Sequence, residues 1–207
     1  MVLPVIFNVV GSSFSIIEGI ISSHGYAAIF ILMLLESSSI PVPSEVVLPL
    51  AGVMAAKGIL GFYPALLVAT VGSLIGMGID YYIGYFVGKD IIYRHLELFH
   101  VTKTSLRKFD RWFMINGEAV VFISRMVPVI RTIASLPAGF ARMAKRKFFT
   151  YSAAGALVWN SVLMTFGFVT FNSYNGSAGS AVIVLLSLAA FGTVLYYVYH
   201  ITKKHLR

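Results

Sequence analysis

The sequence predicts an all-α polytopic membrane protein in which two oppositely oriented re-entrant hairpins and several spanning helices form an inverted repeat. The first observation is composition: of 207 residues, 58% are hydrophobic and 12% are charged, whereas a soluble domain carries about 25% charged residues. The second is a set of three apolar runs that are each long enough to cross a bilayer. The third is a pair of apolar regions that proline and charge interrupt.

The three long runs are expected to be spanning helices, because about 20 apolar residues cross the hydrocarbon core. They cover residues 62–88, 148–171 and 181–201. Residues 1–22 contain no Lys or Arg and therefore lack the basic start of a cleaved signal peptide. We interpret them as an N-terminal helix that either spans the membrane or lies on it. The whole chain, residues 1–207, is read as one membrane domain.

The two interrupted regions are expected to be re-entrant hairpins, over residues 26–57 and 119–141. A continuous helix through either one would place prolines and charges at mid-membrane, where proline removes a backbone donor and breaks helix geometry. Irregular backbone at that depth is tolerated only inside protein or beside a water cavity. The residues that break the two hairpins are Pro41, Pro43, Pro128, Pro137 and Gly139.

Basic residues set the expected orientation, because loops rich in Lys and Arg stay in the cytoplasm. They gather in residues 91–115, 142–147 and 203–207, whereas residues 172–180 carry no charge. The C-terminus is therefore expected in the cytoplasm, with the first hairpin opening outward and the second inward, as in many secondary transporters. Residues 91–115 are predicted to lie on the cytoplasmic membrane face, with a solvated helical loop as the alternative. The net charge of +8 is attributed to these loops rather than to nucleic-acid binding.

Four charged residues fall within the broken segments: Glu36 and Glu45 in the first, Arg125 and Arg131 in the second. Intramembrane charges are costly and usually face a partner in the bundle interior. A static network that holds the hairpins together is one interpretation. We favour a functional role, because desolvation offsets much of the attraction in a buried ion pair.

The chemistry of these side chains suggests phosphate binding coupled to protons. Arginine stays charged and offers a planar fork of donors that suits phosphate oxygens, so Arg125 and Arg131 are the expected head-group ligands. Glu36 and Glu45 could alternate between pairing with arginine and carrying a proton. Asp80, within a predicted span, is either a further proton carrier or a structural partner. The chain has no cysteine, its histidines are scattered, and neither a metal nor a cofactor is expected.

Three motifs together resemble the signatures of the DedA family, also called the VTT or SNARE-associated Golgi protein family. They occur in family order over residues 26–160. The motifs are Glu36-x4-Pro41-x-Pro43-Ser44-Glu45 with Leu48-Pro49-Leu50-Ala51-Gly52, then Gly72-x3-Gly76-x4-Tyr81-x2-Gly84-x3-Gly88, then Phe122-x2-Arg125-x2-Pro128-x2-Arg131-x5-Pro137-Ala138-Gly139. Met77 departs from the family pattern, in which many relatives carry an acidic residue; here the acid is Asp80.

The resemblance implies paired re-entrant hairpins and the essential positions Glu36, Glu45, Arg125 and Arg131. It also implies a membrane lipid transporter or flippase, with proton-coupled translocation of polyprenyl (undecaprenyl) phosphate in the plasma (inner) membrane of a bacterium. The expected partners are a phosphate-bearing lipid and protons, and a homo-oligomer is left open. The alternatives are a phospholipid scramblase, a membrane enzyme acting on lipid phosphates, and a structural protein that aids membrane assembly.

Overall fold

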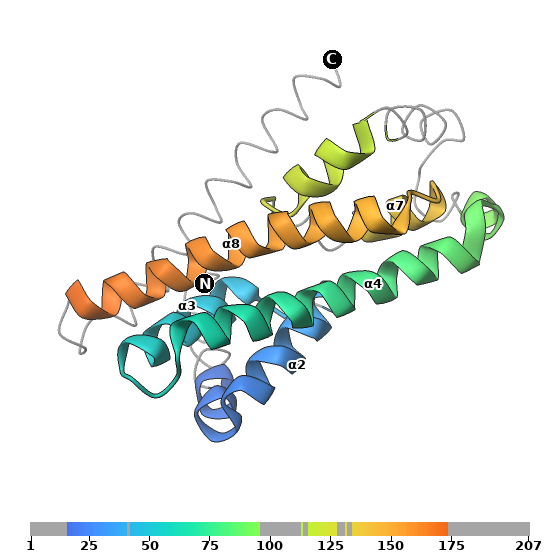
Figure 1. Ribbon diagram of the computed structural model, residues 1–207. Coiled ribbons are helices and arrows are strands. Elements are labelled where there is room, and N and C mark those ends of the chain that lie inside the picture. The colour runs from blue at the N-terminus through green and yellow to red at the C-terminus, as the bar shows by residue number, and fades with distance from the viewer. Residues whose placement is uncertain are drawn as a thin grey trace, which may run out of the picture. The chain divides into compact units, whose positions relative to one another are not determined.

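The computed structural model describes residues 16–40, 42–95, 113, 116–127, 131 and 134–173, with backbone alone for residues 87–95 and 173. Across these residues the regular structure is helical and no strand occurs, which confirms the predicted all-α class. Residues 16–24 and 116–124 are helical. The other helices are α2 (Tyr26–Ser37), α3 (Ser44–Ala56), α4 (Phe62–His95), α7 (Ser135–Phe140) and α8 (Lys145–Ser173) (Figure 1).

Two of these helices, α4 and α8, are long and apolar enough to cross a membrane. The qualifying segments are Phe62–Phe86, with a mean hydropathy of 1.8, and Lys145–Asn172, with 1.5. Both overlap runs from which spans were predicted. Helix α4 does not end near Gly88 but continues to His95. The predicted span 181–201, most of segment 91–115 and the C-terminus lie outside the described residues.

Helices α2 and α3 are too short to span. With 12 and 13 residues they are about 18 and 20 Å long, against a hydrocarbon core of about 30 Å. Pro43 is the N-cap of α3 and has extended backbone angles, which suits a residue that donates no backbone hydrogen bond. Such short helices are compatible with re-entrant segments, but the hairpins and the inverted repeat stay predictions.

The chain divides into two compact units. Unit 1 comprises residues 1–32, 43–69 and 160–207, and unit 2 comprises residues 33–42 and 70–159. Helices α2, α4 and α8 each contribute residues to both units.

In unit 1, α3 approaches the C-terminal part of α8 backbone to backbone. A Cβ atom on Gly52 would collide with the carbonyl oxygen of Met164, and one on Gly167 would collide with that of Pro49. Small residues at helix interfaces permit this closeness, which favours packing between helices in lipid.

Unit 2 repeats this kind of contact between α7 and α4. A Cβ atom on Gly139 would collide with the carbonyl oxygen of Tyr81, and one on Gly84 with that of Leu136. The Tyr81 ring is fully buried and stacks on Phe148 of α8, with ring centroids 4.5 Å apart. The Tyr81 hydroxyl donates to the carbonyl of Met143 at 2.5 Å. These contacts fix α7 against α4, and α4 against the start of α8.

Gly139→Ala tests this close approach. We expect a loss of about 1–3 kcal/mol in the free energy of unfolding, because the added methyl group meets backbone that cannot rotate away. Thermal unfolding of the purified full-length protein in detergent measures it. Gly19→Ala is the matched control, since no atom of the described residues outside its own helix turn lies within 4 Å of the added Cβ and alanine favours the helix. Equal unfolding temperatures for Gly139→Ala and wild type would contradict the packing argument.

Candidate functional site: a buried cluster of charges in unit 2

Four charged side chains are buried in unit 2, and they come from four separate segments. Their residues are between 2% and 8% exposed: Glu36, Asp80, Arg125 and Arg131. Glu36 lies near the end of α2, Asp80 in the middle of α4, and Arg125 in the turn after helical residues 116–124. Buried charges need partners, because removing one ion from water into a low-dielectric interior costs roughly several kcal/mol even after the protein relaxes.

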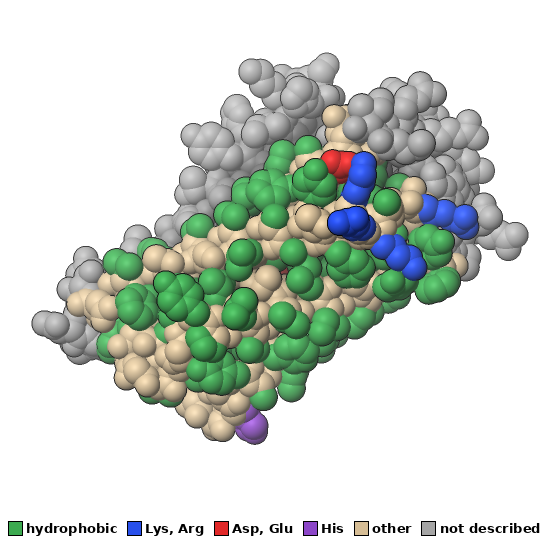
Figure 2. All heavy atoms as spheres, viewed as in Figure 1, with side chains coloured by type: hydrophobic (Ala, Val, Ile, Leu, Met, Phe, Trp, Pro, Cys, Tyr) green, Lys and Arg blue, Asp and Glu red, His purple; other side chains and the backbone are tan. Residues whose placement is uncertain are grey.

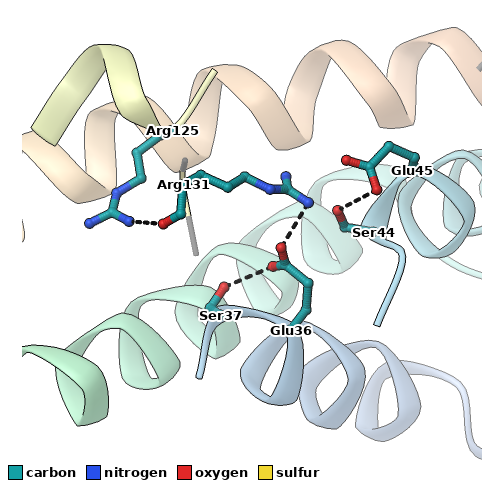
Figure 3. Close-up of polar contacts among 6 residues, drawn as sticks. All are labelled: Glu36, Ser37, Ser44, Glu45, Arg125 and Arg131. Carbon is teal, nitrogen blue, oxygen red and sulfur yellow. Dashed lines mark hydrogen bonds and ion pairs between the residues drawn. The ribbon is translucent and has the colours of Figure 1, made fainter. Parts of the chain in front are cut away.

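Arg131 and Glu36 form the central ion pair of the cluster. The Nη2 atom of Arg131 lies 2.8 Å from Oε1 of Glu36, and both side chains are less than a tenth exposed. Ser37 Oγ donates to the other carboxylate oxygen of Glu36 at 3.0 Å. Figure 3 shows the Arg131 side chain reaching toward the Glu36 carboxylate. Both predicted functional residues are thus brought into direct contact.

Arg125 is held by protein groups instead of by an acid. Its Nη1 atom donates to the backbone carbonyl of Arg131 at 2.5 Å, and Nη2 donates to the hydroxyls of Ser135 and Ser152, each at 3.1 Å. In Figure 3 the Arg131 side chain extends away from the Arg125 guanidinium. The guanidinium also lies 5.7 Å from the centroid of the Phe148 ring. Arg125 therefore ties the backbone of Arg131 to α7 and α8.

Asp80 accepts a hydrogen bond from Ser39 Oγ at 2.6 Å. Ser39 has a φ of 62°, a left-handed conformation that only small polar residues visit readily apart from glycine. The bond connects the turn after α2 to the middle of α4, so it helps to fix the segment that carries Glu36.

Trp159 of α8 covers Arg131 from one side. The guanidinium carbon lies 5.4 Å from the indole ring centroid, within the range for cation–π attraction. The indole N–H is buried and has no hydrogen-bond acceptor in the described part of the chain. A buried indole N–H usually finds a partner, so this donor is available beside the ion pair.

The other predicted site residues lie on α3, on α7 or outside the described residues. Glu45 belongs to unit 1, in the first turn of α3, where Ser44 Oγ donates to its carboxylate at 3.5 Å. Pro137 and Gly139 lie inside α7. Pro41 and Pro128 lie outside the described residues. Where the structure describes the chain, it groups no three His, Asp or Glu side chains that could hold a metal ion.

Sequence reasoning missed the hydroxyls that complete the cluster: those of Ser39, Ser135 and Ser152. Serines are common in loops and small-residue helices, so nothing distinguished these ones from their neighbours. One signal was available, because Ser39 follows Glu36 within the first motif and Ser135 precedes Pro137 within the third.

The long apolar helices α4 and α8 and the buried cluster of two arginines and two acids are features of a helical membrane protein. The VTT domain model matches residues 42–169 of the chain. The chain is 34% identical over 187 residues to undecaprenyl phosphate transporter A of Staphylococcus aureus, covering 88% of this chain and 89% of that protein. The chain belongs to the VTT domain family, also known as the DedA family.

One further relative carries the same name as the S. aureus protein, and another carries a different name. Undecaprenyl phosphate transporter A of Bacillus subtilis is 29% identical over 191 residues, which cover 91% of this chain and 94% of that protein. A protein of Lactococcus lactis subsp. lactis named alkaline phosphatase-like protein is also 29% identical, over 88% of this chain and 91% of its own length. No solved structure matches this chain.

Ser152→Ala tests the role of Arg125 as the tie between segments. We expect the free energy of unfolding to fall by about 1.5–3 kcal/mol, the range for a hydrogen bond to a charged group. Thermal unfolding in detergent gives the change. Thr150→Ala on the same helix is the control, because the Thr150 hydroxyl is exposed and bonds only within α8, to the carbonyl of Arg146. The tie is refuted if both variants unfold at the same temperature.

Proposed function

We propose that this protein translocates a phosphate-bearing polyprenyl lipid across the bacterial inner membrane, with Arg131 as the ligand of the lipid head group. The single observation that carries the proposal is the buried ion pair between Arg131 and Glu36. The names of the relatives in S. aureus and B. subtilis point to undecaprenyl phosphate as the lipid.

The proposed cycle exchanges one anion for another at the Arg131 guanidinium. A phosphate group offers oxygens that match the planar guanidinium fork better than a point charge does. When phosphate binds Arg131, the Glu36 carboxylate loses its partner in a low-dielectric site and takes up a proton. When the phosphate leaves, Glu36 releases that proton and pairs with Arg131 again. Proton uptake and lipid binding are coupled in this way.

The other buried groups have supporting roles in the proposal. Arg125 holds α7 and α8 in place through its bonds to Ser135 and Ser152. The guanidinium keeps these bonds while its positive charge attracts the phosphate. The buried indole N–H of Trp159 supplies one more donor beside Arg131. Glu45 and Asp80 remain candidates for carrying protons to and from Glu36.

Two alternative functions are kept beside the proposed lipid transport. A phospholipid scramblase would use the same helices without proton coupling. A lipid-phosphate hydrolase is kept because a relative from L. lactis is named alkaline phosphatase-like protein. Release of inorganic phosphate from the lipid identifies the hydrolase, and transport that ignores a pH gradient identifies the scramblase. The proposal also includes a cytoplasmic C-terminus, an inverted repeat and a homo-oligomer. Each of these can be examined with the same reconstituted protein.

The first prediction concerns the ion pair itself, measured as flipping of undecaprenyl phosphate in proteoliposomes. Arg131→Ala abolishes transport, and it also costs about 3–5 kcal/mol of stability by leaving a buried carboxylate without its partner. Arg131→Lys keeps the positive charge but loses the planar guanidinium fork. We expect this variant to fold and to transport the lipid more slowly than wild type. The surface variant Arg146→Ala transports like wild type. Wild-type rates in a folded Arg131→Lys protein would refute the role of the guanidinium.

The second prediction concerns Glu36 and pH. In wild type, binding of the lipid phosphate strengthens as pH falls, because protonated Glu36 no longer competes for Arg131. Glu36→Gln removes the competing charge at every pH, so binding in this variant lacks that dependence and transport no longer follows an imposed pH gradient. Lipid binding to purified protein, measured from pH 5 to 8 (about three decades of proton concentration, above the range in which an exposed carboxyl titrates), separates the two. Parallel pH profiles in both proteins would rule out Glu36 as the proton site.

The third prediction concerns Trp159. Trp159→Phe keeps an aromatic ring over Arg131 but removes the N–H donor. We expect the affinity for lipid phosphate to fall about 10- to 150-fold, as for one hydrogen bond of about 1.5–3 kcal/mol to a charged group, with the unfolding temperature unchanged. Equal affinities in the variant and wild type would show that the indole acts only through its ring.

A further inference from the structure

An apolar groove runs along α4 within unit 2. Its volume is about 750 Å³, and it is lined by one face of α4 between Val71 and Phe86 together with Phe149 of α8. The lining positions recur every three or four residues, so they form a continuous stripe about 22 Å long on the helix. Gly78 lies in this stripe, and its missing side chain leaves room beside the Phe149 ring.

The groove lies on the opposite face of α4 from the buried charge cluster. Asp80, Tyr81 and Gly84 point toward the interior of unit 2, whereas Ile79 and Ile83 in the stripe are nearly half exposed. At 100° per residue these two sets face away from each other. The groove is therefore separate from the site proposed for lipid phosphate transport.

Two cations stand at one end of the groove. Lys145 Nζ lies 5.1 Å from the ring centroid of Tyr82, which lines the groove, and the Arg142 guanidinium lies 5.4 Å from that of Tyr85. Arg142 has a φ of 50°, an uncommon conformation for a residue of this size, and here it follows directly after α7. Figure 2 shows basic side chains gathered at this end of an apolar face, over the start of α8.

The neighbouring cation Lys147 is already engaged. Its Nζ lies 2.5 Å from Oε1 of Glu118. Arg142 and Lys145 contact aromatic rings, which leave their N–H groups open to an anion because the attraction is to the ring face. The end of the groove thus presents positive charge directly beside apolar surface.

We propose that this groove binds an anionic phospholipid of the surrounding bilayer, with one hydrocarbon chain along α4 and the phosphate at Arg142 and Lys145. The stripe is longer than one leaflet of hydrocarbon, about half of the 30 Å core, so a whole chain fits along it. A second copy of this protein is a poor occupant, because a symmetric contact places the same patch on both sides and would bring the two basic ends toward like charges. A free phosphate ion would leave the apolar length of the groove unused.

Native mass spectrometry of the full-length protein tests this, with palmitoyl-oleoyl phosphatidylglycerol compared with the phosphatidylcholine that has the same chains. Wild type retains phosphatidylglycerol preferentially. The double variant Arg142→Ala with Lys145→Ala lowers its affinity for phosphatidylglycerol about 10- to 30-fold, the effect of two basic residues near an anionic head group. It leaves the affinity for phosphatidylcholine unchanged. Equal retention of the two lipids by wild type overturns the proposal.

Matched variants separate this site from general surface effects. Ile79→Trp fills the groove and lowers the binding of both lipids, whereas Leu67→Trp, exposed on α4 but outside the groove, lowers neither. Arg146→Ala removes an exposed cation next to Lys145 in the chain. It lowers the affinity for phosphatidylglycerol less than Arg142→Ala or Lys145→Ala does. A loss for Arg146→Ala as large as for these two would overturn the proposal in favour of diffuse charge.

The protein has no native cysteine, so Ile79→Cys carries its only thiol at the groove. This variant reports whether a second copy covers the groove. In proteoliposomes under mild oxidation it is expected to stay monomeric on non-reducing gels, with Leu67→Cys as the comparison. Efficient disulfide-linked dimers specific to Ile79→Cys would mean that a second copy, and not a lipid, occupies the groove.

Discussion

The ion pair between Arg131 and Glu36 is the interaction on which the arrangement of unit 2 depends. Two charges in a low-dielectric interior lose their hydration, and their mutual attraction repays this only when the geometry and the remaining hydrogen bonds are good. Ser37 adds a bond to the carboxylate, and the ring of Trp159 covers the guanidinium. An apolar pair of similar volume would join the same segments at lower cost, so the presence of charge here favours a role in recognising an anion.

The charge cluster can be this compact because glycine lets the helices around it come close. Gly139 and Gly84 bring α7 onto α4, and Gly155 leaves room on α8 for the stem of Arg125. In lipid, such close packing replaces the hydrophobic driving force that holds soluble helices together. Arg125 then ties the turn, α7 and α8 through three donated hydrogen bonds. The two arginines therefore differ in their partners: Arg125 is held by backbone and hydroxyl groups, and Arg131 pairs with Glu36.

Helix α4 serves two environments along one length. Its inner face carries Asp80 and Tyr81 into the core of unit 2, and its outer face forms the apolar groove that ends beside Arg142 and Lys145. The inner face meets the polar groups of the buried charge cluster, whereas the lining of the outer face is apolar. A single spanning helix can connect both, because side chains a half-turn apart point in opposite directions.

Composition and residue pattern by themselves determined the class of this protein and a set of candidate site residues. Few charges and long apolar runs predict a helical membrane protein, and charges flanked by proline in apolar surroundings single out Glu36, Glu45, Arg125 and Arg131, because charges within a membrane are costly and usually face a partner. The sequence predicted that acids pair with arginines, but not which acid meets which arginine. The particular contacts depend on which helix faces turn toward each other. These contacts are the Arg131–Glu36 pair, the bonds from Arg125 to Ser135 and Ser152, and the bond from Ser39 to Asp80. Only the tertiary structure decides this, because short side chains such as serine become ligands through position and not through any pattern in the chain.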